Sequence, residues 1–143
     1  MMEPVLIDTR EQYELCRAHG FEPLLGLHLF PMDINLRVSI QRELFGTGHT
    51  PQENERFYRW CWDHYPHICM ETMRPLRQYS ATYVSHILTR GAHPEMAHDP
   101  RNVNILCFEM HNKWENGNRE CMRIYRANQL VIEQLKNEYR NVK

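Results

Sequence analysis

The chain has 143 residues, of which 42% are apolar and 24% charged, and its formal net charge is −1. A chain of this length has the size of one globular domain and can bury one modest core without disulfides or a structural metal. Because the two signs of charge nearly balance, no chain-wide basic field marks it as a partner of polyanions. Any nucleic-acid surface must therefore be local.

Two features argue against a membrane or secreted protein. The longest apolar stretch, around residues 24–30, is interrupted by Gly26 and His28 and is far shorter than the roughly 20 residues that span a bilayer. The first residues lack the basic segment and the apolar segment of a secretory signal. We therefore expect a soluble, intracellular protein.

The first half of the chain predicts helices joined by short loops. Thr9 and Gln12 fit a capping box for a helix over residues 10–19, and a second helix is expected over 35–44. A third begins in the segment Thr-Pro-Gln-Glu at residues 50–53, where an N-cap, a proline and a glutamate agree with one another. Apolar residues recur along this helix at helical spacing and predict a buried face: Phe57, Trp60, Cys61 and His64.

The pattern changes in the second half. Residues 79–88 and 103–107 are rich in β-branched and aromatic residues and predict two strands. The segment between them, 89–102, contains glycine and prolines and predicts a loop. A helix is expected over 108–115, ended by Gly117.

The C-terminal segment 119–139 keeps one helical face apolar, so we expect it to be helical and to pack onto the preceding part. A break near Asn128 remains open, since asparagine is a good helix cap. The whole chain predicts a single α+β domain that is mostly helical. Its expected parts are a helical segment 1–66, a strand-loop-strand-helix segment 67–117 and a helical segment 118–143.

Three residues carry the functional signal. His86 ends the first predicted strand, Asn102 starts the second, and His111 lies in the helix that follows. In this order and spacing they resemble the HNH family of endonucleases, whose motif is also called ββα-metal or His-Me finger. The resemblance covers about residues 69–117, the middle third of the chain. It implies the ββα-metal fold and metal-dependent hydrolysis of phosphodiester bonds in DNA.

The resemblance also implies a role for each residue of the trio. His86 matches the general base, which takes a proton from the attacking water, and an imidazole with a pKa near 6.5 suits that task. Asn102 matches the asparagine that pins the loop and orients the base, with Asn104 as the alternative. Taken singly, His86 is typical of a core histidine, and Asn102 of a turn residue after Asp-Pro.

His111 matches a metal ligand of the family. Glu115 lies four residues on, on the same helical face, so the pair is expected to approach one cation; an exposed carboxylate without a ligand role is the alternative for Glu115. The family usually has Asp or His before the base, where this chain has Ser85, a weaker ligand for a hard cation. Asp99, Glu115 or a water held by Ser85 are the candidate replacements.

The cysteines depart from the family as well. Many of its members hold zinc with two Cys-x-x-Cys pairs, but here the five cysteines form no such pair, and the matching positions keep only Cys69 and Cys107. Thr72 and Met110 occupy two of the other positions. We therefore expect no structural four-cysteine zinc, support of the motif by the flanking helices, and Cys69 and Cys107 close together in space.

In the mechanism that the resemblance implies, Mg²⁺ or Mn²⁺ contacts the scissile phosphate and the leaving oxygen while His86 activates water. Arg90 and Arg101 are candidates for holding phosphate, because a guanidinium matches its geometry, with a solvated surface charge as the equal alternative for each. Residues 119–143 have six basic side chains against three acidic ones. Three of these arginines fall at helical spacing and predict a basic stripe for the nucleic-acid backbone, with a solvated helix face as the alternative: Arg119, Arg123 and Arg126.

Two other classes of function remain open. The serine at position 85 is also consistent with a catalytically inert module that keeps the HNH fold and binds nucleic acid or serves in assembly. A purely structural role in a larger complex is the third hypothesis. The resemblance further suggests DNA processing by a phage or mobile element, in the cytoplasm of a bacterium or phage-infected host. DNA against RNA, nicking against double-strand cleavage and the oligomeric state stay open.

Overall fold

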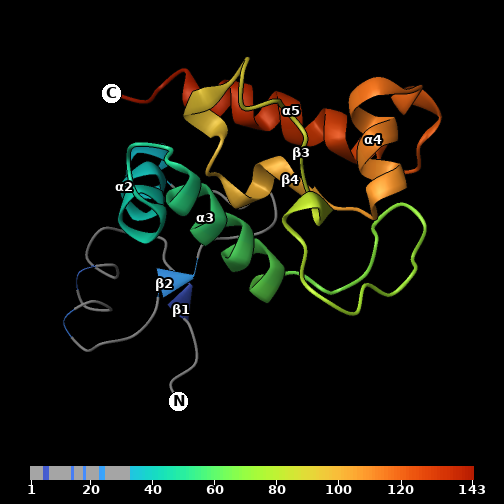
Figure 1. The fold of residues 1–143 in the computed structure, drawn as a ribbon. Coiled ribbons are helices and arrows are strands. Elements are labelled where there is room, and N and C mark those ends of the chain that lie inside the picture. The colour runs from blue at the N-terminus through green and yellow to red at the C-terminus, as the bar shows by residue number, and fades with distance from the viewer. Residues whose placement is uncertain (1–4, 7–13, 15–17, 19–22, 25–32) are drawn as a thin grey trace.

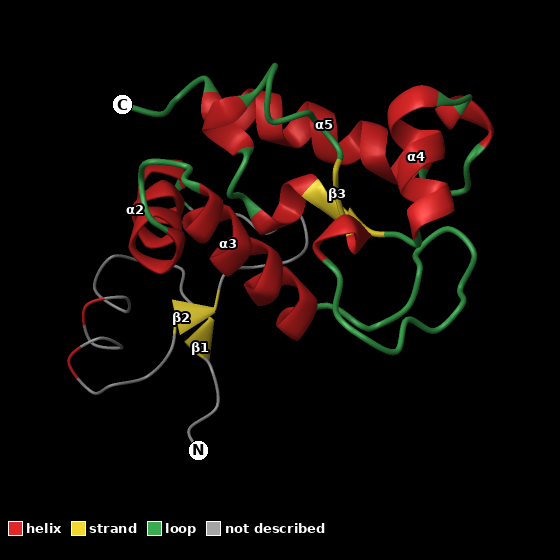
Figure 2. Cartoon of the chain, viewed as in Figure 1, coloured by secondary structure: helices red, strands yellow, loops and turns green. Residues whose placement is uncertain are grey.

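The structure is a computed structural model that describes residues 5–6, 14, 18, 23–24 and 33–143. The described part is α+β and mostly helical (Figures 1 and 2). Its helices are α2 (Ile34–Phe45), α3 (Pro51–His64), α4 (Phe108–Asn116) and α5 (Tyr125–Tyr139). Its strands are β1 (Val5–Leu6) and β2 (Pro23–Leu24), which pair in parallel, and β3 (Val84–His86) and β4 (Val103–Ile105), which pair antiparallel.

The two helices of the N-terminal part begin where the sequence predicts. The carboxylate of Asp33 accepts the backbone N–H of Asn35 at 2.8 Å and so starts α2. At the start of α3, Thr50 accepts the N–H of Glu53 at 3.1 Å, and the Glu53 carboxylate accepts the N–H of Thr50 at 3.0 Å, which completes a capping box. The helix predicted over residues 10–19 lies outside the described residues except for Glu14 and Ala18, which are helical.

The central strands are shorter than the sequence predicts. The predicted strand 79–88 contains a 3₁₀ turn, Ala81–Tyr83, and only Val84–His86 pair with β4. Side chains bind backbone N–H groups on either side of this short strand. Ser80 accepts the N–H of Thr82 before it, and Asn102 accepts the N–H of Leu88 after it. The order strand, loop, strand, helix is nevertheless the predicted one.

The C-terminal segment is not one helix. A 3₁₀ turn, Arg119–Cys121, precedes α5, so the break falls earlier than Asn128. Asn128 lies inside α5 and is buried, and its amide exchanges two hydrogen bonds with the amide of Asn104 on β4, at 2.7 and 3.2 Å. This reciprocal pair joins α5 to β4.

Aromatic side chains form the centre of the core. Phe45 of α2 meets Phe57 and Trp60 of α3 edge to face, with ring centroids 5.1 and 5.8 Å apart. Phe57, Trp60 and Cys61 are buried, which confirms the predicted apolar face of α3. His64, at the edge of this face, stacks on the Trp60 ring. No helix in the described ranges is long and apolar enough to cross a membrane.

Candidate functional site

His86 is the last residue of β3, and its imidazole ring makes one hydrogen bond to the backbone. Its Nε2 lies 2.8 Å from the carbonyl oxygen of Ala97, in the loop between the two strands. A carbonyl only accepts, so Nε2 carries the ring proton and donates it to Ala97. The other nitrogen, Nδ1, therefore has the free electron pair, and His86 presents a fixed tautomer that can accept a proton there.

The surroundings of His86 keep the ring neutral. Burial lowers its pKa to about 4, and the positive charges of Arg90 and His111 act in the same direction, while the bond to Ala97 opposes them. The ring packs beside Phe57 of α3, with centroids 6.0 Å apart. At neutral pH the side chain is thus almost wholly in the form that accepts a proton.

Asn102 ties together the two ends of the loop that holds His86. Its amide accepts the N–H of Leu88 at 2.8 Å and donates to the carbonyls of Leu88 and Met96 at 3.0 and 3.2 Å. Met96 directly precedes Ala97, whose carbonyl holds the His86 ring. Asn102 is fully buried, so these bonds fix the position of His86 through the loop backbone.

His111 and Glu115 lie together on α4, the helix that follows β4. The ring nitrogen Nε2 of His111 is 3.2 Å from Oε1 of Glu115, and their side chains are 21% and 42% exposed. Two neighbouring ligands at about 2.1–2.2 Å from one cation are about 3 Å apart, so the pair has the spacing to hold a divalent ion from one side. No group of three or more His, Cys, Asp or Glu side chains with metal-site geometry occurs among the described residues.

Ser85 lies on the other face of β3 from His86. Successive side chains of a strand alternate, and Ser85 pairs with Asn104, whose side chain points to α5. The Ser85 hydroxyl is buried and has no hydrogen-bond partner in the described part of the chain. The structure therefore brings His86, Asn102 and the loop together but does not place Ser85 with them.

Asp99 and Arg101 have structural roles instead of the predicted functional ones. Asp99 is fully buried, and its carboxylate binds Arg37 of α2 at 2.8 Å and Arg101 at 2.9 Å. Burial raises the pKa of Asp99, but the two guanidinium groups outweigh it and hold the pKa far below its ordinary value. Arg101 also binds Glu138 of α5 at 2.9 Å. Asp99 is thus not available to a metal, nor Arg101 to a phosphate.

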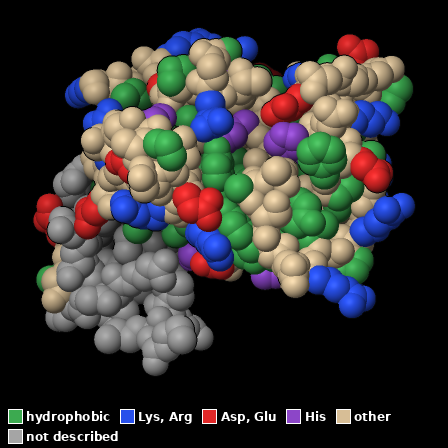
Figure 3. Space-filling model, viewed as in Figure 1, with side chains coloured by type: hydrophobic (Ala, Val, Ile, Leu, Met, Phe, Trp, Pro, Cys, Tyr) green, Lys and Arg blue, Asp and Glu red, His purple; other side chains and the backbone are tan. Residues whose placement is uncertain are grey.

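The predicted basic stripe does not lie on a single helix. Arg119 belongs to the 3₁₀ turn and lies over the ring of Trp114 at 4.6 Å, Arg123 follows that turn, and Arg126 is in α5. Arg90 is exposed, and its positive charge lowers the pKa of His86. On the face drawn in Figure 3, Lys and Arg alternate with Asp and Glu and form no single basic field. Among the arginines predicted to contact phosphate, Arg90 is the one whose charge acts on His86.

No family model matches this chain, and neither a curated protein nor a solved structure matches it.

Cys69 and Cys107 are neighbours, as the sequence analysis predicts. Their sulfur atoms are 3.6 Å apart. The histidines nearest in sequence to Cys69 are engaged elsewhere, since His67 stacks on Trp62 with centroids 3.7 Å apart and its Nε2 binds the Trp62 carbonyl. His64 stacks in the same way on Trp60.

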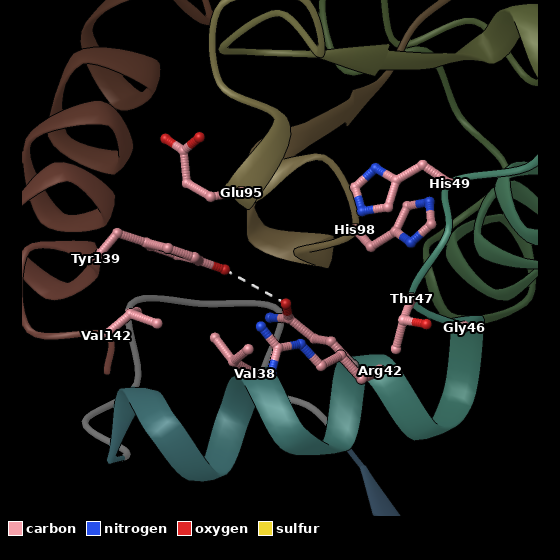
Figure 4. A pocket seen from close by; sticks show the side chains of 10 residues that line it. Val38, Arg42, Gly46, Thr47, His49, Glu95, His98, Tyr139 and Val142 are labelled. Atoms are coloured by element: carbon pink, nitrogen blue, oxygen red, sulfur yellow. Dashed lines mark hydrogen bonds between the residues drawn. The ribbon is translucent and has the colours of Figure 1, made fainter.

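A cavity of about 140 Å³ lies between α2, the loop residues 94–98 and the end of α5 (Figure 4). Arg42, His49 and Glu95 line it, and Tyr139 points across it to Gln41. None of the trio His86, Asn102 and His111 lines this cavity, so it is separate from the candidate site.

Sequence reasoning missed two parts of the site. The carbonyl of Ala97 fixes the tautomer of His86, and no sequence pattern marks a backbone acceptor. Tyr58 of α3 packs against His86 edge to face, with centroids 6.1 Å apart, and burial raises its pKa. Its position next to Phe57 on the apolar face of α3 is the one signal that pointed to it.

Proposed function

We propose that this chain is a metal-dependent endonuclease of the HNH type that hydrolyses phosphodiester bonds of DNA. The observation that most supports this proposal is the setting of His86 at the end of β3. The Ala97 carbonyl fixes its ring proton on Nε2, and Asn102 ties the loop that carries Ala97. The helix after β4 then carries His111 and Glu115 at a spacing that fits two ligands of one cation. In this proposal, β3 supplies the base and α4 supplies the residues that would hold the cation.

In this proposal the protein groups divide the work of an in-line hydrolysis. His86 accepts at Nδ1 the proton of the water that attacks phosphorus, a general-base contribution of about 10² to 10⁴ in rate. Arg90 pairs with a non-bridging phosphate oxygen. His111 and Glu115 would hold a Mg²⁺ or Mn²⁺ ion, which supplies charge to offset the negative charge that develops on the leaving oxygen.

The low pKa of His86 makes the base dependent on its substrate. With a pKa of about 4, the neutral ring is available but is a weak proton acceptor. An anionic phosphate beside Arg90 would offset the arginine charge that lowers this pKa and would raise the proton affinity of the ring. Burial is the larger cause of the low pKa and is unchanged by the phosphate, so in this proposal phosphate binding strengthens the base in part.

An inert module that binds nucleic acid is the second candidate, and the position of Ser85 favours it. The carboxylate or histidine that the family has at this position is absent. The serine is on the same face of the sheet as Asn104, away from His86. A cation at α4 then has two protein ligands, which is few for a tightly bound ion. Cleavage and binding must therefore be measured separately.

The decisive experiment is plasmid cleavage with matched histidine variants. We expect the chain to nick or linearise supercoiled DNA with Mn²⁺ or Mg²⁺, and a chelator or His86→Ala to stop it. His93→Ala is the matched control, because His93 lies in the same loop with its ring near Glu95, and it should cut like the parent. Single-stranded DNA and RNA are assayed beside the plasmid. Intact substrates throughout, with retained DNA binding, would favour the inert module.

A further inference from the structure

The two cysteines beside the candidate site face each other across a rigid junction. Cys69 lies in the turn of residues 68–75, and Cys107 is the N-cap residue of α4. Their sulfurs are 3.6 Å apart, whereas a disulfide needs about 2.05 Å, so closure requires an approach of about 1.5 Å. Rotation about the side-chain bonds of Cys107 supplies a movement of this size.

The backbone around both cysteines is fixed. Cys69 donates its N–H to Arg74 and accepts from Met73 across the 68–75 turn, at 2.9 and 2.8 Å, and Met70 donates to Ile105 at the end of β4 at 2.8 Å. The carbonyl of Cys107 accepts the N–H of His111 at 2.9 Å. The turn and the helix start are thus both tied to the same strand end, which keeps the two sulfurs opposed.

The thiols differ in a way that suits exchange. Burial raises the pKa of Cys69, but hydrogen bonds from the Thr72 side chain and from the backbone of Cys107 outweigh it and lower the pKa below its ordinary value. Burial and the neighbouring Cys69 raise the pKa of Cys107. Cys69 is buried and Cys107 is half-buried. A disulfide reagent from solution would therefore reach Cys107 first, and the more acidic thiol of Cys69 lies behind Cys107.

We propose that Cys69 and Cys107 form a redox-active dithiol that closes to a disulfide by exchange with a small-molecule disulfide such as oxidised glutathione. In the first step Cys107 passes its proton to the Cys69 thiolate, and the Cys107 sulfur attacks one sulfur of the reagent. The small thiolate that is released takes this proton from Cys69 and leaves as a thiol, so that Cys69 is again a thiolate. In the second step the Cys69 thiolate attacks Sγ of Cys107 and releases the other. Two protein thiols are oxidised and one reagent disulfide is reduced to two thiols.

The closed form would join the 68–75 turn covalently to the N-cap residue of α4. This inference stands on the two sulfurs and does not rest on the proposed nuclease activity. Four of the five cysteines lie in the described part, and each of the other two there offers a control, since Cys61 is fully buried and Cys121 is exposed.

The test is thiol counting on the full chain in mixtures of reduced and oxidised glutathione, with acid quenching, alkylation after denaturation and intact mass. We expect the number of alkylated cysteines to fall from five to three in one step. Cys121→Ser should fall from four to two, whereas Cys107→Ser and Cys69→Ser should each lose no pair. Trypsin does not cut the Arg74–Pro75 bond, so it should release residues 60–77 joined to residues 102–113, with fragmentation placing the bond on Cys69 rather than Cys61.

Three outcomes would overturn the proposal. One is a parent chain that keeps five thiols in every mixture. Another is a bond between a different pair, such as Cys107 and Cys121. The third is accumulation of a glutathione adduct on Cys107 that does not resolve, because a resolving thiol 3.6 Å away should displace it.

Discussion

Asp99→Asn should be the most destabilising polar substitution in the part of the chain that the structure describes. The carboxylate is fully buried and accepts hydrogen bonds from Arg37, Arg101 and Tyr139, each with a contact of 2.8 or 2.9 Å. An amide keeps the shape but leaves two buried guanidinium groups short of their counter-charge. Removing one partner of a buried ion pair costs about 3–5 kcal/mol. With an unfolding entropy of about 0.3 kcal/mol/K for 143 residues, the melting temperature should fall by about 10–16 °C.

The pH dependence of stability gives a second readout of the same change. The folded-state pKa of Asp99 lies well below its value in the unfolded chain, so its contribution is complete above the unfolded pKa of about 4 and is lost as pH falls below it. Below about pH 4 the parent should therefore lose about 1.4 kcal/mol per pH unit more than Asp99→Asn. Denaturant unfolding at several pH values measures both quantities.

Glu55→Gln is the matched control for this substitution. Glu55 pairs with Arg59 on the surface of α3 at 3.1 Å, with side chains 48% and 60% exposed, and exposed pairs contribute about 0–1 kcal/mol. The control should melt within about 3 °C of the parent. If Asp99→Asn is as mild as Glu55→Gln, or if its deficit does not shrink below pH 4, the network of Arg37, Asp99 and Arg101 does not have the role assigned to it.

Three further predictions concern the site and its support. His111→Ala should weaken Mn²⁺ binding at least tenfold in calorimetric titration while His86→Ala leaves it nearly unchanged, because a ligand holds the ion and a base acts on water; equal affinity for the His111 variant would place the ion elsewhere. Asn102→Ala should cost about 2–3 kcal/mol in urea unfolding, since it leaves the half-buried N–H of Leu88 and the carbonyls of Leu88 and Met96 without this partner, and a cost below about 0.5 kcal/mol would contradict this. Asn104→Leu alone should cost about 1–3 kcal/mol, whereas Asn104→Leu with Asn128→Leu should recover most of that loss, and a double variant as weak as the sum of the singles would show that the pair is not coupled.

The sequence was sufficient for the elements whose ends are set by local chemistry. The start of α3 follows from Thr50, Pro51 and Glu53, and the end of α4 at Gly117 was expected from Asn-Gly. Strand lengths were overestimated, because β-propensity does not reveal that Ser80 and Asn102 take the N–H groups at the two ends of β3.

Order and spacing singled out His86, Asn102 and His111 as candidates, and their functional roles stay predictions. The predicted nearness of Cys69 to Cys107 is confirmed. The sequence did not separate a functional acid from a structural one, so Asp99 stood among the candidate metal ligands, whereas in the structure its carboxylate pairs with Arg37 of a distant helix. Such long-range partners are set by tertiary packing and leave no local signal.

The rate of plasmid nicking by His86→Ala, with and without added imidazole, tests the central claim most directly. The proposal predicts that the parent cuts with Mn²⁺, that the variant loses at least about 10² in rate while still binding Mn²⁺, and that imidazole restores part of the activity by replacing the lost base. A variant that cuts as fast as the parent would show that His86 is not the base, and a parent that cuts nothing with either metal would contradict the nuclease itself.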